Sequence, residues 1–262
     1  MVIRNLSNKQ WANTLLKKAE AEWLSEKIAI GVVVPWTKNL LENTKDSEQM
    51  LDLGSGTGHI SAFLASKGRK MTLLDFSQEN LDFSCKIFNI LGLQGKFVKS
   101  DMKKPLPFED NSFDTVFSVG VLEYFSDQEI DAILKEAFRV SRKKVIVIVP
   151  NALSLFYRIG RWYSKVTHNW EWGFERPFYS LSSHFKSIES TQFLEYTVGT
   201  KQSLEFLTMF KGVVRSILFR TLRLKDDSKP SRFRQGFVLI SIGEKNEQLI
   251  MDSKNLFGQN NN

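Results

Sequence analysis

The sequence contains a single cysteine, Cys85, among its 262 residues. One thiol cannot form an intrachain disulfide, a C-x-x-C redox pair or a multi-thiolate zinc site, and no metal is predicted. Long apolar runs are lacking too: the two longest, at 28–36 and 145–149, fall far short of the roughly 20 residues of a transmembrane helix. Residues 1–11 have no apolar core. No signal peptide is therefore expected, and a cytoplasmic location is predicted.

Strand and helix patterns alternate through the middle of the chain. Short apolar runs, such as Val-Ile-Val-Ile-Val at 145–149, alternate with segments of helical periodicity that close at Gly68 and Gly92. This alternation predicts right-handed βαβ units in a doubly wound, mostly parallel α/β sheet. The expected strands are 50–53, 70–74, 95–99, 113–119 and 144–149, and the expected helices are 60–67, 80–91 and 127–140.

Both ends of the chain depart from this alternation. Apolar residues at helical spacing predict two helices within 8–43. Beyond Pro150 the expected elements are a helix at 151–168, a Trp/Gly/Pro loop at 169–179, a strand at 187–198, a helix at 203–224 and a strand at 235–244. We expect one domain in four parts: a helical cap (1–48), a cofactor-binding core (49–150), substrate-side helices and final strands (151–245), and a flexible tail (246–262).

Polar and glycine-rich motifs stand at the ends of neighbouring predicted strands. Leu51–Gly58, with the sequence Leu-Asp-Leu-Gly-Ser-Gly-Thr-Gly, follows one strand and opens a helix. Glycines there permit positive φ angles and let backbone N–H groups approach a ligand. Asp75 ends the next strand, where a carboxylate can accept hydrogen bonds from ribose hydroxyls. Asp101 and Met102 follow the third strand and suit an adenine amino group and its ring. Each feature alone is also typical of a turn or cap, but together they predict one nucleoside site.

These residues together resemble the class I S-adenosylmethionine-dependent methyltransferases. The resemblance is strong over 49–151, and segments 105–114 and 121–124 are similar to the small-molecule branch that includes ubiquinone and menaquinone methyltransferases. It implies a seven-stranded sheet whose last strand, at 236–244, is antiparallel and inserted between the fifth and sixth. It implies S-adenosylmethionine as the cofactor, held by Asp52, Gly54, Gly56, Gly58, Asp75, Phe76, Asp101, Met102 and Val119.

The resemblance also implies in-line methyl transfer to a small-molecule or lipid-like acceptor. The cofactor supplies the reactive group, so the protein mainly has to align the reactants and need not carry a recognisable catalytic residue. The candidates for catalysis are His168, Tyr124 and Glu123. Many relatives have histidine where this chain has Glu123 or Tyr124, so the role of that histidine does not transfer. Further candidates for substrate contact are Tyr157, Trp162, Trp170, Trp172, Glu175 and Tyr179.

Positive charge is concentrated near the C-terminus. Residues 211–234 contain eight basic and two acidic side chains, a net of +6 out of +7 for the whole chain. As a helix, 203–224 would place apolar residues mostly on one side and basic residues on the other. Three readings stay open: packing on the domain with a solvated basic side, peripheral contact with an anionic membrane, and, least favoured, nucleic-acid binding.

Two other functions also stay open. An NAD(P)-binding oxidoreductase would use an acid like Asp75, but its fingerprint has a third glycine three residues after the second, where this chain has His59. A methyltransferase-like subunit that binds the cofactor without catalysis is not separated from an enzyme by these motifs.

Overall fold

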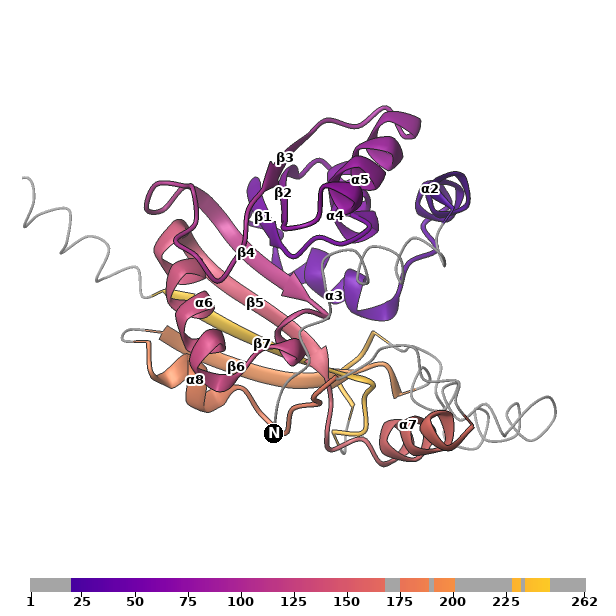
Figure 1. Cartoon of the computed structure of the whole chain (residues 1–262), viewed down its shortest axis with the longest axis vertical. Helices are drawn as coiled ribbons and strands as arrows, with labels where there is room; N and C mark the ends of the chain where they lie inside the picture. Colours follow the sequence, from indigo (N-terminus) through magenta and orange to yellow (C-terminus); the bar gives the residue numbers. More distant parts are fainter. Residues whose placement is uncertain (1–19, 168–174, 189–190, 201–227, 232–233, 246–262) are drawn as a thin grey trace, which may run out of the picture.

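The computed structural model describes residues 20–167, 175–188, 191–200, 228–231 and 234–245. Within them, seven strands form one sheet in the order β3-β2-β1-β4-β5-β7-β6. The strands are β1 (Gln49–Leu53), β2 (Lys70–Asp75), β3 (Gly95–Lys99), β4 (Phe113–Val119), β5 (Ser141–Pro150), β6 (Thr191–Val198) and β7 (Val238–Lys245). Strands β1 to β5 pair in parallel, and β7 is antiparallel to both β5 and β6. The predicted α/β sheet with an inserted antiparallel strand is therefore confirmed (Figure 1).

Helices lie on both faces of this sheet (Figure 1). One buried apolar cluster joins the sheet to α6 and α8, and a second joins it to α2, α3, α4 and α5. The helix α7 lies past the tip of β5 (Figure 1). The bounds are α2 (Ala21–Ala29), α3 (Pro35–Asn43), α4 (His59–Ser66), α5 (Gln78–Ile90), η1 (Leu122–Tyr124), α6 (Asp127–Val140), α7 (Leu155–Val166) and α8 (Ser182–Lys186).

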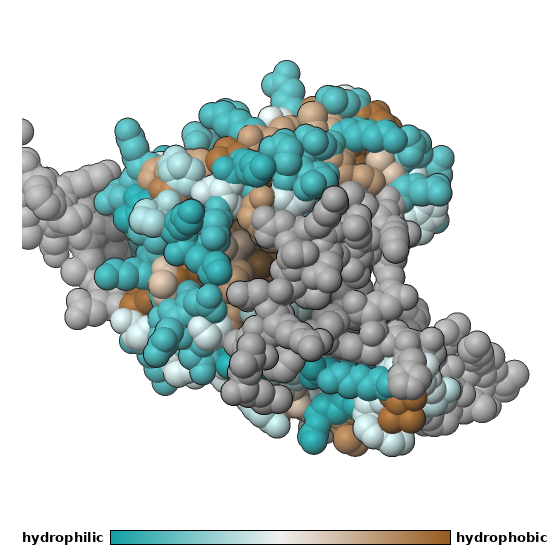
Figure 2. All heavy atoms as spheres, viewed as in Figure 1, coloured by the Kyte–Doolittle hydropathy of each residue, from teal (hydrophilic) through white to brown (hydrophobic). Residues whose placement is uncertain are grey.

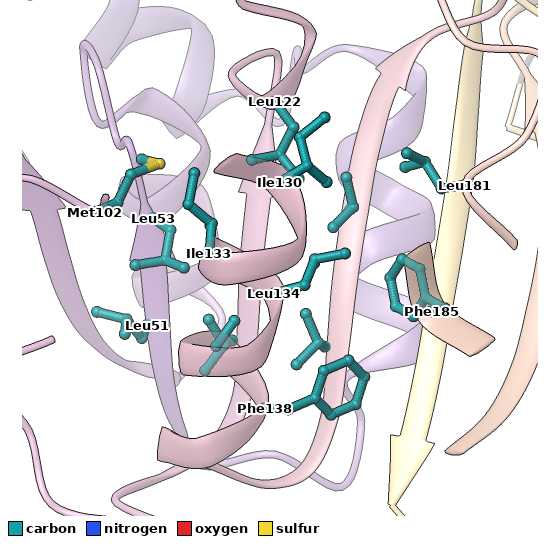
Figure 3. Close-up of a cluster of buried hydrophobic side chains, with 14 of the residues drawn as sticks. Leu51, Leu53, Met102, Leu122, Ile130, Ile133, Leu134, Phe138, Leu181 and Phe185 are labelled. Atoms are coloured by element: carbon teal, nitrogen blue, oxygen red, sulfur yellow. The ribbon is translucent and has the colours of Figure 1, made fainter. Parts of the chain in front are cut away.

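The helix α6 shows how local sequence builds this architecture. Ser126 Oγ accepts a hydrogen bond from the Glu129 N–H, and the Glu129 carboxylate accepts one from the Ser126 N–H, so the helix begins with a capping box. Apolar residues then recur at helical spacing on the side that faces the sheet (Figure 3). Burial of each large apolar side chain contributes roughly 1.5–3 kcal/mol. The buried apolar residues of α6 include Ile130, Ile133, Leu134, Ala137 and Phe138, of which all but Ala137 are large.

Three predicted elements begin later than their patterns indicate, and one of them is the last strand, which was expected from residue 235 and is found at Val238–Lys245. The helix expected from residue 151 starts at Leu155, because the Asn151 amide instead donates to the carbonyls of Arg234 and Gly236 at 2.7 and 2.8 Å. The strand expected from residue 187 starts at Thr191. The helix α8 ends at Lys186, directly before the expected start, so the chain needs several residues to enter the strand.

Several expectations lie outside the described residues. They are the part of the first predicted helices before residue 20, the basic segment 203–224 and the tail 246–262. No helix of the described ranges is long and apolar enough to cross a membrane. The face in Figure 2 is mostly hydrophilic over the described residues, with hydrophobic side chains in small groups, one of them at α7.

The start of β4 is tied to its neighbours by Asp114. Its Oδ2 accepts hydrogen bonds from the Glu48 and Gln49 N–H groups, each at 2.9 Å, and Arg142 lies 3.2 Å from Oδ1. Burial raises the pKa of Asp114, but these hydrogen bonds and the charges of Arg142 and Lys143 outweigh it, so the pKa is lowered overall.

We expect Asp114→Asn to reduce the free energy of unfolding by about 1–3 kcal/mol at pH 7, because the carboxylate accepts two backbone hydrogen bonds. A lowered pKa stabilises the fold above the ordinary carboxyl range, and this contribution is lost as the pH falls through the lowered value. Urea unfolding at pH 7 and at pH 3 measures this, with Asp82→Asn on the exposed side of α5 as the control. An equal loss at both pH values would contradict an ionic role for Asp114.

Candidate methyltransferase site

The glycine turn between β1 and α4 is held in a conformation that only glycine adopts readily. Gly54, Gly56 and Gly58 have φ angles of +78°, +53° and +67°. The N–H groups of Gly54 and Ser55 donate to the carbonyl of Leu74 at 2.8 and 3.1 Å, which fixes the turn against the end of β2. The backbone therefore passes closely over the carboxyl ends of β1 and β2, as the sequence predicts.

Asp75 is fastened to this turn. One carboxylate oxygen accepts a hydrogen bond from the Gly56 N–H at 2.9 Å, and the other accepts from the Ser77 N–H at 2.9 Å and the Asn80 amide at 3.2 Å. Burial raises the pKa of Asp75 even though these hydrogen bonds lower it. Because each carboxylate oxygen has two lone pairs, the acid keeps capacity to accept from a ligand.

Asp52 places a second acid beneath the turn. Its side chain is 4% exposed, and its Oδ2 accepts a hydrogen bond from Ser61 Oγ at 2.6 Å. Burial raises the pKa of Asp52 to about 7, with a further contribution from the charge of Asp75. Two acids thus share a dry region next to the glycine turn.

The remaining predicted cofactor residues surround the same edge of the sheet. A Cβ atom at Gly54 would lie 2.8 Å from Met102 Cε and 2.8 Å from Val121 Cγ2, so the turn touches both the third and the fourth strand ends. Asp101 is half-buried, and its Oδ1 accepts a hydrogen bond from the Lys103 N–H at 3.0 Å. Phe76 and Val119 are also half-buried at the ends of β2 and β4.

His59 is the first residue of α4, and its Nδ1 lies 2.8 Å from Thr57 Oγ1. Burial lowers the pKa of His59 to about 4, so the imidazole is neutral near pH 7. It occupies the position of a third dinucleotide-fingerprint glycine and adds no positive charge to the turn.

The charges of the site fit S-adenosylmethionine better than a dinucleotide. An acid like Asp75 serves either ligand, but Asp52 beside the turn would repel a pyrophosphate, whereas it favours a positively charged sulfonium or ammonium group. The Ser55 hydroxyl is buried without a hydrogen-bond partner in the described part of the chain, which leaves a polar group for a ligand at the turn. A larger residue at Gly54 would be strained by the φ of +78° and would displace the Val121 side chain.

Comparison with known proteins agrees with this geometry. A family model described as a methyltransferase domain matches residues 50–144. The chain is 32% identical over 116 residues to a putative methyltransferase, YqeM, of Bacillus subtilis, covering 43% of this chain and 46% of that protein. It is 30% identical over 101 residues to malonyl-[acyl-carrier protein] O-methyltransferase of Serratia marcescens, covering 38% and 37%. These matches span less than half the length of either relative.

A solved structure extends the likeness in fold. Magnesium protoporphyrin IX methyltransferase from Synechocystis, with bound SAH, has a TM-score of 0.54 at 13% identity, covering 80% of this chain and 82% of that one. Residues 50–144 of this chain therefore match a methyltransferase domain. The predicted enzyme class and cofactor are confirmed at this level, and the nicotinamide alternative loses its support.

Several residues predicted to contact the acceptor are exposed or lie outside the described residues. His168, Trp170 and Trp172 fall in the latter group. Trp162 and Tyr179 are each 63% exposed. Trp162 lies on an apolar side of α7, together with the exposed residues Leu155, Ile159 and Val166.

The other acceptor-side candidates form a buried polar cluster. The Tyr157 hydroxyl donates a hydrogen bond to Glu175 Oε1, and Arg161 donates to the carbonyl of Glu175. Glu123 and Tyr124 in η1 interact electrostatically with this group. Burial and the charges of Glu123 and Glu175 raise the pKa of Tyr124, so its phenol stays protonated and is no base near neutral pH.

Two contributors were missed by the motifs. Asn80 supports Asp75, and the spacing of three residues from the Ser77 cap was the signal that it sits in the first turn of α5 beside the acid. Arg161 stands one helical turn after Tyr157, so helical periodicity from Tyr157 was the signal for it.

Proposed function

We propose that the whole protein transfers a methyl group from S-adenosylmethionine to a small-molecule or lipid-like acceptor. The observation that carries this proposal is the hydrogen bond from the Gly56 N–H to the Asp75 carboxylate, at 2.9 Å. It joins the glycine turn and the ribose-type acid into one site beside the buried Asp52.

Binding and turnover test the proposal. Calorimetry should give saturable binding of S-adenosylmethionine and S-adenosylhomocysteine, and none of NAD. Incubation with a metabolite extract should then release S-adenosylhomocysteine. Binding without this product would favour the non-catalytic subunit and contradict the enzymatic proposal.

The proposed roles follow the strands. The turn at 54–58 and Asp52 would hold the methionine end of the cofactor, Asp75 and Phe76 the ribose, and Asp101 and Met102 the adenine, with Val119 beside the bound group. When bound, the cofactor supplies a methyl group already activated by positive sulfur. The chain itself has to orient the acceptor and exclude water.

We expect Asp75→Ala to weaken S-adenosylhomocysteine binding by about 1–3 kcal/mol, because the variant removes a charged hydrogen-bond acceptor from the ribose site. Calorimetry measures the affinity, and circular dichroism checks that the variant is folded. Asp82→Ala removes an exposed acid on the following helix, α5, and serves as the charge-matched control. A folded Asp75→Ala protein with unchanged affinity would show that another group binds the ribose.

The acceptor class and the cellular setting belong to the same proposal. The segments 105–114 and 121–124 support a place in the ubiquinone- and menaquinone-methyltransferase branch, whose acceptors are prenylated. The net charge of +6 over 211–234 supports a cytoplasmic protein that touches an anionic membrane peripherally, which suits such an acceptor. In this division of labour, 49–150 binds the cofactor, 151–245 faces the acceptor, and 1–48 and 246–262 flank them.

A further inference from the structure

A buried acid at the tip of β4 has no assigned task in cofactor binding. The side chain of Glu123 is 3% exposed, and its Oε2 has no hydrogen-bond partner among the described residues. A buried carboxyl oxygen without a partner is costly, so such groups are usually retained for a reason other than stability.

Glu123 lies close to the glycine turn, which is the proposed site of the methionine end of the cofactor and so of the transferred methyl group. Val121 touches the glycine turn at Gly54, and Glu123 follows it by two residues in η1. A Cβ atom at Gly120 would lie 3.7 Å from Glu123 Oε1, so the carboxyl folds back over the end of β4. The Arg176 N–H donates to the backbone carbonyl of Glu123 at 3.1 Å and holds this segment in place.

Among the described residues, no cation forms an ion pair with Glu123. Burial raises the pKa of Glu123, and the negative charge of Glu175 in the 175–178 segment raises it further, although a hydrogen bond from its own backbone N–H lowers it. From α7, Tyr157 and Arg161 both donate to Glu175. The guanidinium of Arg176 turns away to Asp127, at 2.8 Å. Glu175 thus has hydrogen-bond donors, whereas Glu123 Oε2 has none among the described residues. A ligand with a positive charge or an N–H or O–H group could supply the missing partner.

We infer that Glu123 faces the methyl acceptor, that the acceptor carries an N–H or O–H group, and that Glu123 Oε2 takes its proton. This inference rests on the proposed function. As the acceptor atom bonds to the methyl carbon, the methyl–sulfur bond breaks with its electron pair remaining on sulfur. The acceptor proton passes to the Glu123 carboxylate, which becomes a carboxylic acid, so the sulfonium and carboxylate charges disappear together.

A raised pKa suits this role in two ways. It brings the basicity of the carboxylate closer to that of an amine or hydroxyl, which improves proton transfer. The positive sulfonium favours ionisation of a nearby acid, so bound cofactor would prepare Glu123 to accept the proton.

The test compares two stable cofactor analogues by calorimetry. S-adenosylhomocysteine lacks the methyl group, whereas sinefungin carries a CH–NH₃⁺ group where the sulfonium and its methyl stand. If Glu123 faces that point, Glu123→Gln should weaken sinefungin about tenfold or more and S-adenosylhomocysteine less than twofold. Glu109→Gln, an exposed acid in a loop, removes the same charge and should change neither affinity.

Equal effects of Glu123→Gln on both analogues, or no effect on sinefungin, would overturn the inference while leaving the proposed function intact. Failure of the unaltered protein to bind S-adenosylhomocysteine would overturn the proposed function and the inference with it. A second measurement uses the unaltered protein alone: binding enthalpies in buffers of different ionisation enthalpy should show more proton release with sinefungin than with S-adenosylhomocysteine. Equal proton release would also contradict the inference.

Discussion

Replacing Gly58 by alanine is expected to reduce the free energy of unfolding by about 2–5 kcal/mol. Its φ of +67° lies in the left-handed region, which costs a residue with a Cβ about 1–2 kcal/mol. The new Cβ would also lie 2.6 Å from Ser84 Cβ and 3.0 Å from Leu73 Cδ2. Overpacking of this kind typically costs about 1–3 kcal/mol more.

The collision would also disturb the cofactor site. Ser84 Oγ donates to the carbonyl of Gly56 at 3.1 Å, so a displaced Ser84 pulls on the turn itself. We therefore expect weaker S-adenosylhomocysteine binding together with the loss of stability.

Gly92→Ala is the matched control for this change. Gly92 has a similar φ of +64°, but no atom lies within 4 Å of its would-be Cβ, so only the backbone penalty of about 1–2 kcal/mol applies. Urea unfolding of both variants separates the two contributions. An equal loss of stability would mean that Ser84 and Leu73 yield to the methyl group without cost.

Asp52→Asn is expected to make the cofactor-free protein more stable above pH 7, by about 2–4 kcal/mol. The pKa of Asp52 is raised from 3.8 to about 7, chiefly by burial. Between these values the folded state binds more protons than the unfolded state, so stability is full below the lower value and is lost as the pH rises to the upper one. An asparagine stays neutral throughout and avoids this loss.

The same variant should bind the cofactor more weakly, since it removes an acid from the site, so stability and binding move in opposite directions. Urea unfolding at pH 4, 6 and 8 measures the first effect and calorimetry the second. Ser61→Ala provides the opposite perturbation, because it removes the hydrogen bond that lowers the pKa of Asp52 and should extend the loss of stability to higher pH. Parallel stability curves for Asp52→Asn and the unaltered protein would contradict this account.

The elements between residues 49 and 150 can be predicted from the sequence because the features that delimit them lie close together in the chain. Strand β3 at 95–99, strand β4 at 113–119 and helix α6 at 127–140 have the predicted bounds. Each is delimited by features a few residues apart, such as the Ser126 capping box. The meeting of Gly56 with Asp75 was predictable as well, because parallel strands bring their carboxyl ends to one edge.

The acceptor side was less readable because long-range contacts decide it. Asn151 is drawn out of the predicted helix by carbonyls more than 80 residues away in the chain. Glu175 lies in a loop with no periodicity, so nothing local marks it as the partner of Tyr157. Only the folded chain shows that α7 and this loop form one buried cluster with η1.

The position of the hydrogen bonds around the glycine turn has a consequence for how this protein can diverge. The match to the methyltransferase family model ends at residue 144, inside β5. Among the described residues, the hydrogen bonds that shape the glycine turn join residues within 52–84, and Ser118 Oγ adds one to the carbonyl of Leu53, so all of them lie within the matched stretch. Substitutions beyond Pro150 therefore remove none of these hydrogen bonds directly. Related proteins can therefore share the residues up to 144 and differ beyond Pro150, where the acceptor is proposed to bind.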